Sequence, residues 1–150
     1  MLSKHIDMVK GSKFMKKILI SCILVITLGI SKDYTQADRI LDMQKMAHAM
    51  KDIQSGFFYN NVDIVKAGVE DLKQAVTKIQ ETKEEKLNKD VYEKWITHNI
   101  AMTKRIQRFI STRADTLLER FSTGDAVEAL QVYTKITGEC MKCHIRLRKW

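Results

Sequence analysis

The residues with the clearest chemistry lie near the C-terminus, where Cys140, Met141, Lys142, Cys143 and His144 form a C-x-x-C-H motif. This motif is typical of covalent attachment of a c-type haem. Each thiol can add to a haem vinyl group as a thioether, and the adjacent imidazole can bind the iron from one face. In a helix, both cysteines and the histidine would share one face. A single helix could therefore hold the porphyrin and its metal.

Three other uses of the cysteine pair compete with haem attachment. A thioredoxin-like redox pair expects a strand-helix-strand context, and no strand pattern surrounds the motif. A structural zinc site needs about four ligands and would have to recruit His48 or His98 from distant segments. A disulfide between Cys140 and Cys143 would close a very short, strained loop and leave the histidine without a role. One covalent haem c is the favoured interpretation.

The N-terminal segment predicts export. Lys16 and Lys17 precede an apolar run over residues 18–30, which resembles the hydrophobic region of a signal peptide and is short for a membrane span. We therefore expect a signal peptide over residues 1–31 and a periplasmic mature protein. An uncleaved membrane anchor is the alternative.

The exact processing of this leader is open. Cleavage after Ser31 is favoured over cleavage after Ala37, and both sites have the small residues that a signal peptidase needs. Residues 1–14 are either an over-extended start or a long basic n-region. Cys22 gives only a weak lipoprotein signal, because most of the apolar stretch follows it.

The composition predicts one small all-α domain over residues 38–150. The chain contains no proline and six glycines, so little interrupts long helices. The net charge of +8 belongs largely to the leader, where six lysines against two aspartates lie before Ala37. Removing that segment leaves 20 basic and 16 acidic residues, and nucleic-acid binding loses its main support. The remaining surplus suggests a modest preference for acidic partners.

Apolar residues recurring at three- and four-residue steps predict four helices, over about 38–57, 62–81, 91–121 and 126–147. The charged stretch 81–90 is expected to be a connection. The residues expected to face the core are Ile40, Met43, Met46, Ala47, Met50, Ile53 and Phe57; Val65, Val69, Leu72, Val76 and Ile79; Trp95, Met102, Ile106, Phe109, Ile110, Leu117 and Leu118; and Ala126, Leu130, Tyr133, Ile136, Cys140, His144 and Leu147.

Break signals separate these segments. Gly56 and the Asn60-Asn61 pair are expected to end the first helix, and residues 122–125 provide a break and an N-cap before the last. Short connections between amphipathic helices predict an antiparallel four-helix bundle, whose interior would hold the covalently bound haem.

With this organisation the mature chain resembles the cytochrome c prime family, including its low-spin, methionine-ligated relatives. The match rests on the C-x-x-C-H motif in the last helix, on Gly124-Asp125 and the Glu128-Ala129-Leu130 run that opens that helix, and on Arg148, four positions after His144. Leu147 stands where the family often has an aromatic residue, so this position departs from the family pattern.

The resemblance also extends to the first helix. The family places the residue that faces the distal side of the iron seven positions before a Met-x-x-Ile pattern, with an arginine four positions earlier. Here Met50 to Ile53 supplies the pattern, Met43 the distal position and Arg39 the arginine.

The resemblance implies a role for each of these residues. His144 would be the proximal ligand, and Met43 the sixth ligand or a core residue beside an open site. Arg39 and Arg148 would contact haem propionates or lie near a diatomic ligand, or they are ordinary surface cations. Outside the family motifs, His48 and His98 are expected in solvent, and Trp95, Tyr133 and Trp150 are expected to pack against the ring or the bundle end.

The expected function is that of a periplasmic monohaem c-type cytochrome that transfers single electrons between redox partner proteins and is not an enzyme. The alternative is a five-coordinate haem protein that binds nitric oxide or carbon monoxide. Peroxidase-like catalysis would need a polar acid-base pair that the methionine-rich first helix does not offer. The family also implies a homodimer, which the sequence does not determine.

Overall fold

The computed structural model describes residues 33–90 and 99–148, which belong to one compact unit, Asp33–Trp150. The expected leader lies outside the described residues, as do Trp95, His98 and Trp150. The side chains of Leu147 and Arg148 are outside them as well. None of the described helices combines the length and apolar character that crossing a membrane requires.

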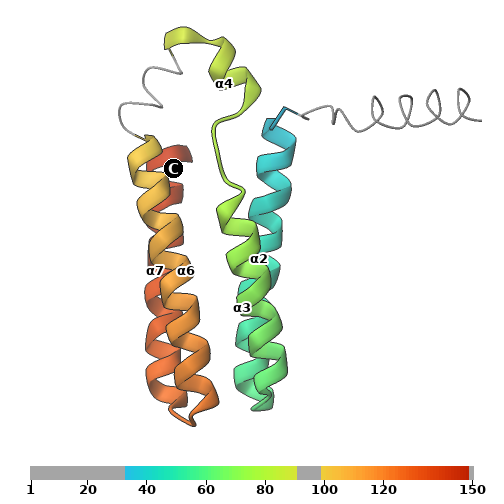
Figure 1. Cartoon of the computed structure of the whole chain (residues 1–150), viewed down its shortest axis with the longest axis vertical. Helices are drawn as coiled ribbons and strands as arrows, with labels where there is room; N and C mark the ends of the chain where they lie inside the picture. The colour runs from blue at the N-terminus through green and yellow to red at the C-terminus, as the bar shows by residue number, and fades with distance from the viewer. Residues whose placement is uncertain (1–32, 91–98, 149–150) are drawn as a thin grey trace, which may run out of the picture. The chain divides into compact units, whose positions relative to one another are not determined.

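The described residues form helices and no strand, so the all-α prediction is confirmed (Figure 1). Their elements are α2 (Gln36–Tyr59), α3 (Val62–Thr77), the short α4 (Lys83–Leu87), α6 (Ala101–Ser122) and α7 (Ala126–Arg148).

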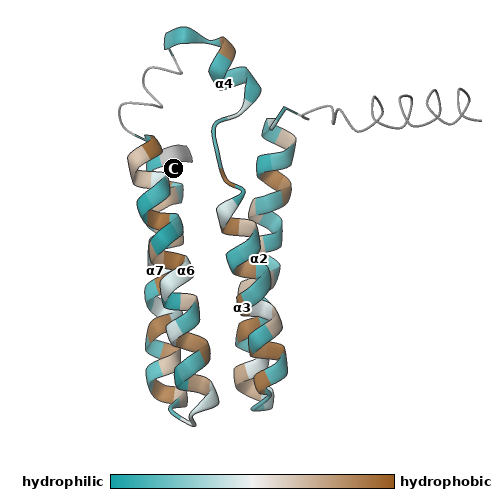
Figure 2. Cartoon of the chain, viewed as in Figure 1, coloured by the Kyte–Doolittle hydropathy of each residue, from teal (hydrophilic) through white to brown (hydrophobic). Residues whose placement is uncertain are grey.

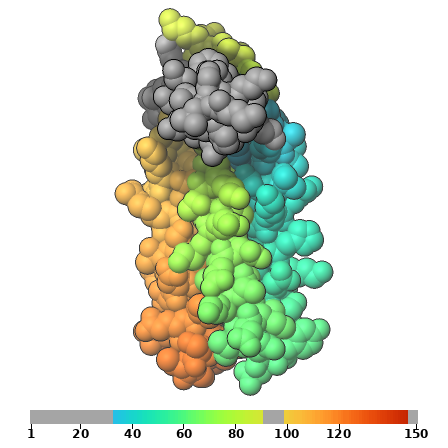
Figure 3. All heavy atoms as spheres, turned by 45° about the vertical axis from the view of Figure 1, so that its right-hand side comes forward, coloured from blue at the N-terminus to red at the C-terminus, as the bar shows by residue number. Residues whose placement is uncertain are grey.

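The four long helices form two antiparallel pairs. Tight turns join α2 to α3 and α6 to α7, and each pair packs along its length. The pairs meet where α3 packs against α6, and Figure 3 shows α3 seated between α2 and α6 on one face. Figure 1 shows the C-terminal end of α7 at the same end of the bundle as the start of α2 and α6.

Local signals set the helix boundaries in most places. Asn60 ends α2 in a left-handed conformation (φ 47°), and the Asn61 side chain caps α3 by accepting from the Ile64 N–H at 3.1 Å. Gly124 has φ +89°, and the Asp125 carboxylate accepts from the Glu128 N–H at 3.0 Å at the start of α7. These predicted breaks are confirmed.

Gly56 was expected to help end the first helix, and that expectation is wrong. Gly56 lies inside α2 and is buried, because α3 passes close to it. A Cβ at this position would lie 2.5 Å from the Val65 side chain. Gly68 of α3 mirrors it, since a Cβ there would lie 2.8 Å from Ile53 Cγ1 and 2.9 Å from the Ala49 carbonyl oxygen. Both glycines allow α2 and α3 to approach closely.

The core lies between the two helix pairs, where each long helix presents its apolar residues, whereas α4 is almost entirely hydrophilic (Figure 2). All five residues expected to face the core from the second helix are buried, although Ile79 lies after the end of α3. The buried apolar residues of the core cluster are Ala49, Ile53, Val65, Val69, Leu72, Val76, Met102, Ile106, Ile110, Ala114, Leu117, Phe121, Ala129, Val132, Ile136 and Cys143.

The expected stripes of the first and last helices are wrong at some positions. Ile40 is 43% exposed and Ala47 is exposed. In α7, Ala126 is exposed and Leu130 is 53% exposed, whereas Ala129 is buried. The tight turn after α6 brings the two helices together there, so the small Ala129 fills the interface that was expected for Leu130.

The segment between α3 and α6 also departs from expectation. The second helix ends at Thr77 instead of Glu81, and the expected connection contains α4. Thr82 begins α4 with a capping box, in which its side chain and that of Glu85 each bond the other's backbone N–H. The helix expected from Val91 is described only from a π-helical turn at Asn99 onward.

Candidate functional site

A cavity of about 200 Å³ lies between the long helices. It brings together predicted site residues that are far apart in the sequence, because Met43 from α2 lines it together with Cys140, Cys143 and His144 from α7. The remaining lining residues are Met46, Ala47, Met50, Val76, Ile79, Thr103, Ile106, Gln107, Ile110, Tyr133 and Thr137.

The cavity is long and mostly apolar. Along α7 its wall runs from Tyr133 to His144, a distance of about 16 Å at about 1.5 Å per residue. Its α2 wall consists of three methionines and Ala47, without any acid or base. Tyr133 closes one end, where its ring packs edge-on against Phe57 at 5.9 Å and its hydroxyl donates to the Met50 carbonyl at 3.3 Å. This shape suits a large apolar occupant.

The two cysteines are free thiols that α7 presents to the cavity. Cys143 is 9% exposed and Cys140 is partly buried. Burial raises the pKa of the Cys140 thiol to about 11. Burial likewise raises the pKa of Cys143, although the charge of Arg39 opposes that shift. Redox-active C-x-x-C pairs need a lowered thiol pKa, so this environment disfavours the thioredoxin-like alternative.

The geometry gives no support to the zinc alternative within the described residues. They contain no group of three or more His, Cys, Asp or Glu side chains placed to hold a metal ion. His48 is exposed on α2 and does not line the cavity. His98 lies outside the residues described.

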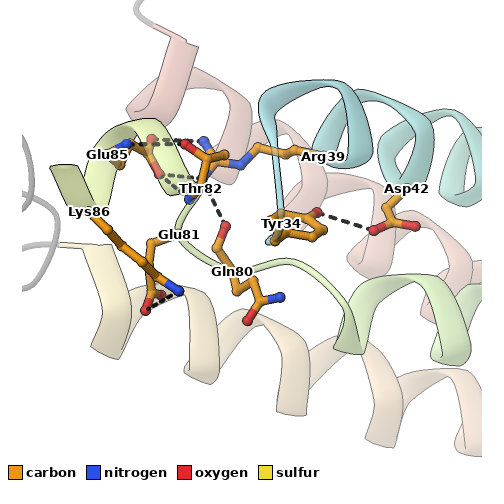
Figure 4. A network of polar contacts seen from close by, with 8 residues as sticks. All are labelled: Tyr34, Arg39, Asp42, Gln80, Glu81, Thr82, Glu85 and Lys86. Atoms are coloured by element: carbon orange, nitrogen blue, oxygen red, sulfur yellow. Dashed lines mark hydrogen bonds and ion pairs between the residues drawn. The ribbon is translucent and has the colours of Figure 1, made fainter. Parts of the chain in front are cut away.

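Arg39 lies near the cavity without lining it. Its guanidinium donates to both carboxylate oxygens of Glu85, at 2.9 and 2.5 Å, and to the Gln80 carbonyl at 2.8 Å (Figure 4). These contacts tie α2 to α4 and to the segment that follows α3. The guanidinium charge still reaches Cys143, since it acts on the pKa of that thiol. Any contact between Arg39 and an anionic group would therefore share the guanidinium with Glu85.

Tyr34 and Thr35 are held to α2 and to the start of α4 by hydrogen bonds. The Tyr34 hydroxyl donates to the buried Asp42 carboxylate at 3.1 Å (Figure 4), and burial and Asp42 raise the pKa of Tyr34. The Tyr34 carbonyl accepts from the Lys83 N–H at 2.7 Å, and Thr35 forms a capping box with Asp38. Cleavage after Ser31 would keep these contacts, whereas cleavage after Ala37 would remove them.

Sequence reasoning missed two polar wall residues, Thr103 and Gln107. The Gln107 side chain donates to the Val76 and Ile79 carbonyls, at 2.9 and 2.8 Å, and so caps the end of α3. Thr103 Oγ1 is buried and has no hydrogen-bond partner among the described residues. Both lie on a helix whose apolar stripe dominated the pattern, so no sequence signal distinguished them.

The donor set of the cavity fits a covalently attached metalloporphyrin. Two thiols and an imidazole lie on one helix, methionine thioethers lie on another, and the wall between them is apolar. Cys140 and Cys143 would bind the ring, and His144 would bind the metal.

Comparisons with known proteins do not add a family assignment. No protein-family model, no curated protein sequence and no solved structure matches this chain.

Proposed function

We propose that this chain is an exported four-helix-bundle cytochrome that carries one covalent haem c and transfers single electrons in the periplasm. Cys140 and Cys143 hold the ring as thioethers, and His144 is the proximal iron ligand. The observation that carries the proposal is the apolar cavity, which collects all three motif residues and Met43 between helices that are distant in sequence.

A bound haem would supply one-electron redox chemistry. The chain would contribute axial donors and a mostly apolar environment. His144 and Met43 approach from opposite helix pairs, and a sulfur ligand together with an apolar wall favours the reduced form and raises the reduction potential. Because the ligands are anchored on packed helices, little rearrangement accompanies electron transfer.

The exposed side of α7 provides a short route between the cavity and a partner protein. Lys142 is 67% exposed within the motif, and Met141 and Ile145 are also exposed beside the buried Cys143. An apolar patch with a basic residue suits transient docking of an acidic redox partner.

The methionine-rich wall supports one other candidate function, binding of nitric oxide or carbon monoxide to a five-coordinate haem. The α2 residues of the wall would exclude water and charge from a diatomic ligand, as such a site requires. They carry no acid-base pair for peroxidase-like catalysis. Met43 decides between the two functions, because a bound Met43 sulfur would occupy the gas-binding position.

Optical and magnetic spectra of the purified ferric protein test this choice, with Met43→Ala and the matched variant Met46→Ala. Met46 lines the same cavity from the same helix, so it controls for loss of volume. Electron transfer predicts a low-spin spectrum with a methionine-to-iron charge-transfer band that Met43→Ala removes and Met46→Ala keeps. A high-spin spectrum in the unmodified chain, with slow carbon monoxide binding after reduction, would contradict ligation by Met43 and support gas binding.

A further inference from the structure

Exposed cations gather at the cavity end of the α6–α7 pair. They are Lys104, Arg105 and Arg108 on α6 and Lys142 and Arg146 on α7, and we call these five residues the basic face. Residues 101–114 contain no carboxylate. Glu139, which pairs with Lys142 at 2.6 Å, is the single carboxylate of residues 138–148. Little negative charge in either segment therefore offsets these cations.

The α6 cations lie on the outward side of their helix. At about 100° per residue, Lys104, Arg105 and Arg108 fall within an arc of about 100°, opposite the buried Ile106 and Ile110. Among the described residues, none of the three cations forms an ion pair. Their charges are therefore available to a molecule that approaches from solvent.

A side-chain contact connects the two halves of the basic face. The Arg146 guanidinium of α7 donates to the Met102 sulfur of α6 at 3.5 Å. Arg105 lies three residues after Met102, on the next turn of the same side of α6. Lys142 lies one turn before Arg146 on α7. The cations of both helices therefore form one continuous surface.

The rest of the described chain does not share this positive charge. Residues 33–90 carry 11 acidic and nine basic side chains, and residues 115–137 carry four acidic and two basic ones. The half of the α6–α7 pair near its tight turn is therefore negative, whereas the cavity end is positive. Such a separation of charge orients the protein as it approaches an anionic partner.

We propose that the basic face is the docking site for an acidic protein that exchanges an electron with the bound haem. This proposal rests on the proposed function and extends the docking surface from α7 to α6. Lys142 and Arg146 flank Cys143 and His144, which line the cavity. A partner on this side of α7 would be separated from the cavity by the width of one helix, about 10 Å.

The composition of the surface favours a protein over an anionic membrane. Met141 and Ile145 are 48% and 58% exposed beside the cations of α7. A small apolar contact with a charged rim is typical of transient protein interfaces. A helix that lies in a membrane surface instead buries a broad apolar side. Three of the five cations are arginines, which bind carboxylates through two parallel hydrogen bonds.

The test uses the full chain with haem attached and an acidic plant-type [2Fe–2S] ferredoxin, whose reduced cluster is a strong one-electron donor. Arg105→Glu/Arg108→Glu reverses two charges of the basic face, and Arg105→Gln/Arg108→Gln serves if the reversal disturbs folding. Lys51→Glu/Lys66→Glu is the matched control, because it makes the same change of net charge at exposed positions of α2 and α3.

Two measurements separate docking from electron transfer. Fluorescence anisotropy of dye-labelled, oxidised ferredoxin gives the affinity. Stopped-flow absorbance gives the rate constant at which the reduced cluster loses one electron and ferric haem gains it. Far-UV circular dichroism checks that each variant keeps its helices.

At low ionic strength we expect the Arg105→Glu/Arg108→Glu variant to lower the affinity and the rate constant by about tenfold or more, and the control by less than about threefold. Equal losses in the two variants would overturn the proposal, because net charge alone would then explain the binding. Tighter binding of the unmodified chain to phosphatidylglycerol vesicles than to ferredoxin would also overturn it, in favour of a membrane surface. Ferredoxin binding that depends on the basic face, without any electron transfer, would support the docking site and refute the proposed function.

Discussion

The cavity itself leads to a quantitative prediction about the chain without haem. A void lined by side chains destabilises a protein by about 24 cal/mol for each Å³ that stays empty. For a cavity of about 200 Å³, this corresponds to at most about 5 kcal/mol, because the cavity is partly open and water can enter it. Small domains have total unfolding free energies of about 5–15 kcal/mol, so the chain without its occupant should lie near the limit of stability.

The Cys140→Ala/Cys143→Ala double variant provides this perturbation in cells that attach haem. Guanidinium chloride unfolding of the unmodified and double-variant proteins, followed by far-UV circular dichroism, gives the two unfolding free energies. We expect the double variant to be less stable by up to about 5 kcal/mol, or to be partly unfolded in buffer. Its absorption spectrum must first show that no haem has bound without thioether links.

Lys142→Ala is the matched control, because it changes the motif without touching either thiol. Lys142 is 67% exposed, whereas its partner Glu139 is only 13% exposed, so we expect the loss of this ion pair to cost about 1 kcal/mol, well below the effect of the double variant. If the double variant without haem were within about 1 kcal/mol of the unmodified protein, the cavity would not be built around an occupant.

Three further perturbations test separate parts of the account. In the chain without haem, burial raises the pKa of Cys140 to about 11 against an ordinary value of 9.0, so alkylation by iodoacetamide should be slow at neutral pH. Because the pKa of Cys140 is higher in the folded chain, its contribution to stability is fully present below about pH 9 and should be lost as the pH rises toward 11. An alkylation rate that follows the ordinary thiol pKa would contradict the burial of Cys140. Gly68→Ala should lower the unfolding free energy by about 1–3 kcal/mol, measured by denaturant titration, because its Cβ would lie 2.8 Å from Ile53 Cγ1. Glu85→Gln should lower the unfolding free energy by about 2 kcal/mol, because it removes the carboxylate that pairs with the partly buried Arg39. An unchanged melting temperature would show that this pair does not hold α4.

The sequence predicted the helical class and much of the site because both depend on local patterns. In α3, Val65, Val69, Leu72 and Val76 recur at steps of four and three residues, and all of them are buried. The C-x-x-C-H motif needs only a helix to bring Cys140, Cys143 and His144 to one face. The cavity also includes Met43, but it includes Met46 and Met50 as well, so only the family resemblance singles out Met43.

The remaining features depend on packing between distant segments. At the start of α7, apolar residues lie on two faces of the helix. The close turn after α6 places Ala129, and not Leu130, against the core. Arg39 pairs with Glu85, which lies 46 residues later in the sequence, and no local pattern indicates this pairing. The polar composition around α4 hid the Thr82 and Glu85 capping box, which the Thr-x-x-Glu spacing could have revealed.

Mass spectrometry of the C-terminal peptide, from protein matured in cells that attach haem, shows whether the porphyrin is bound covalently. We expect one haem mass on the peptide that contains Cys140 and Cys143, with neither thiol open to alkylation after denaturation. The same peptide from the Lys142→Ala variant should carry this mass, and that from the Cys140→Ala/Cys143→Ala variant should not. A peptide of unmodified mass, with both thiols alkylated, would contradict the account.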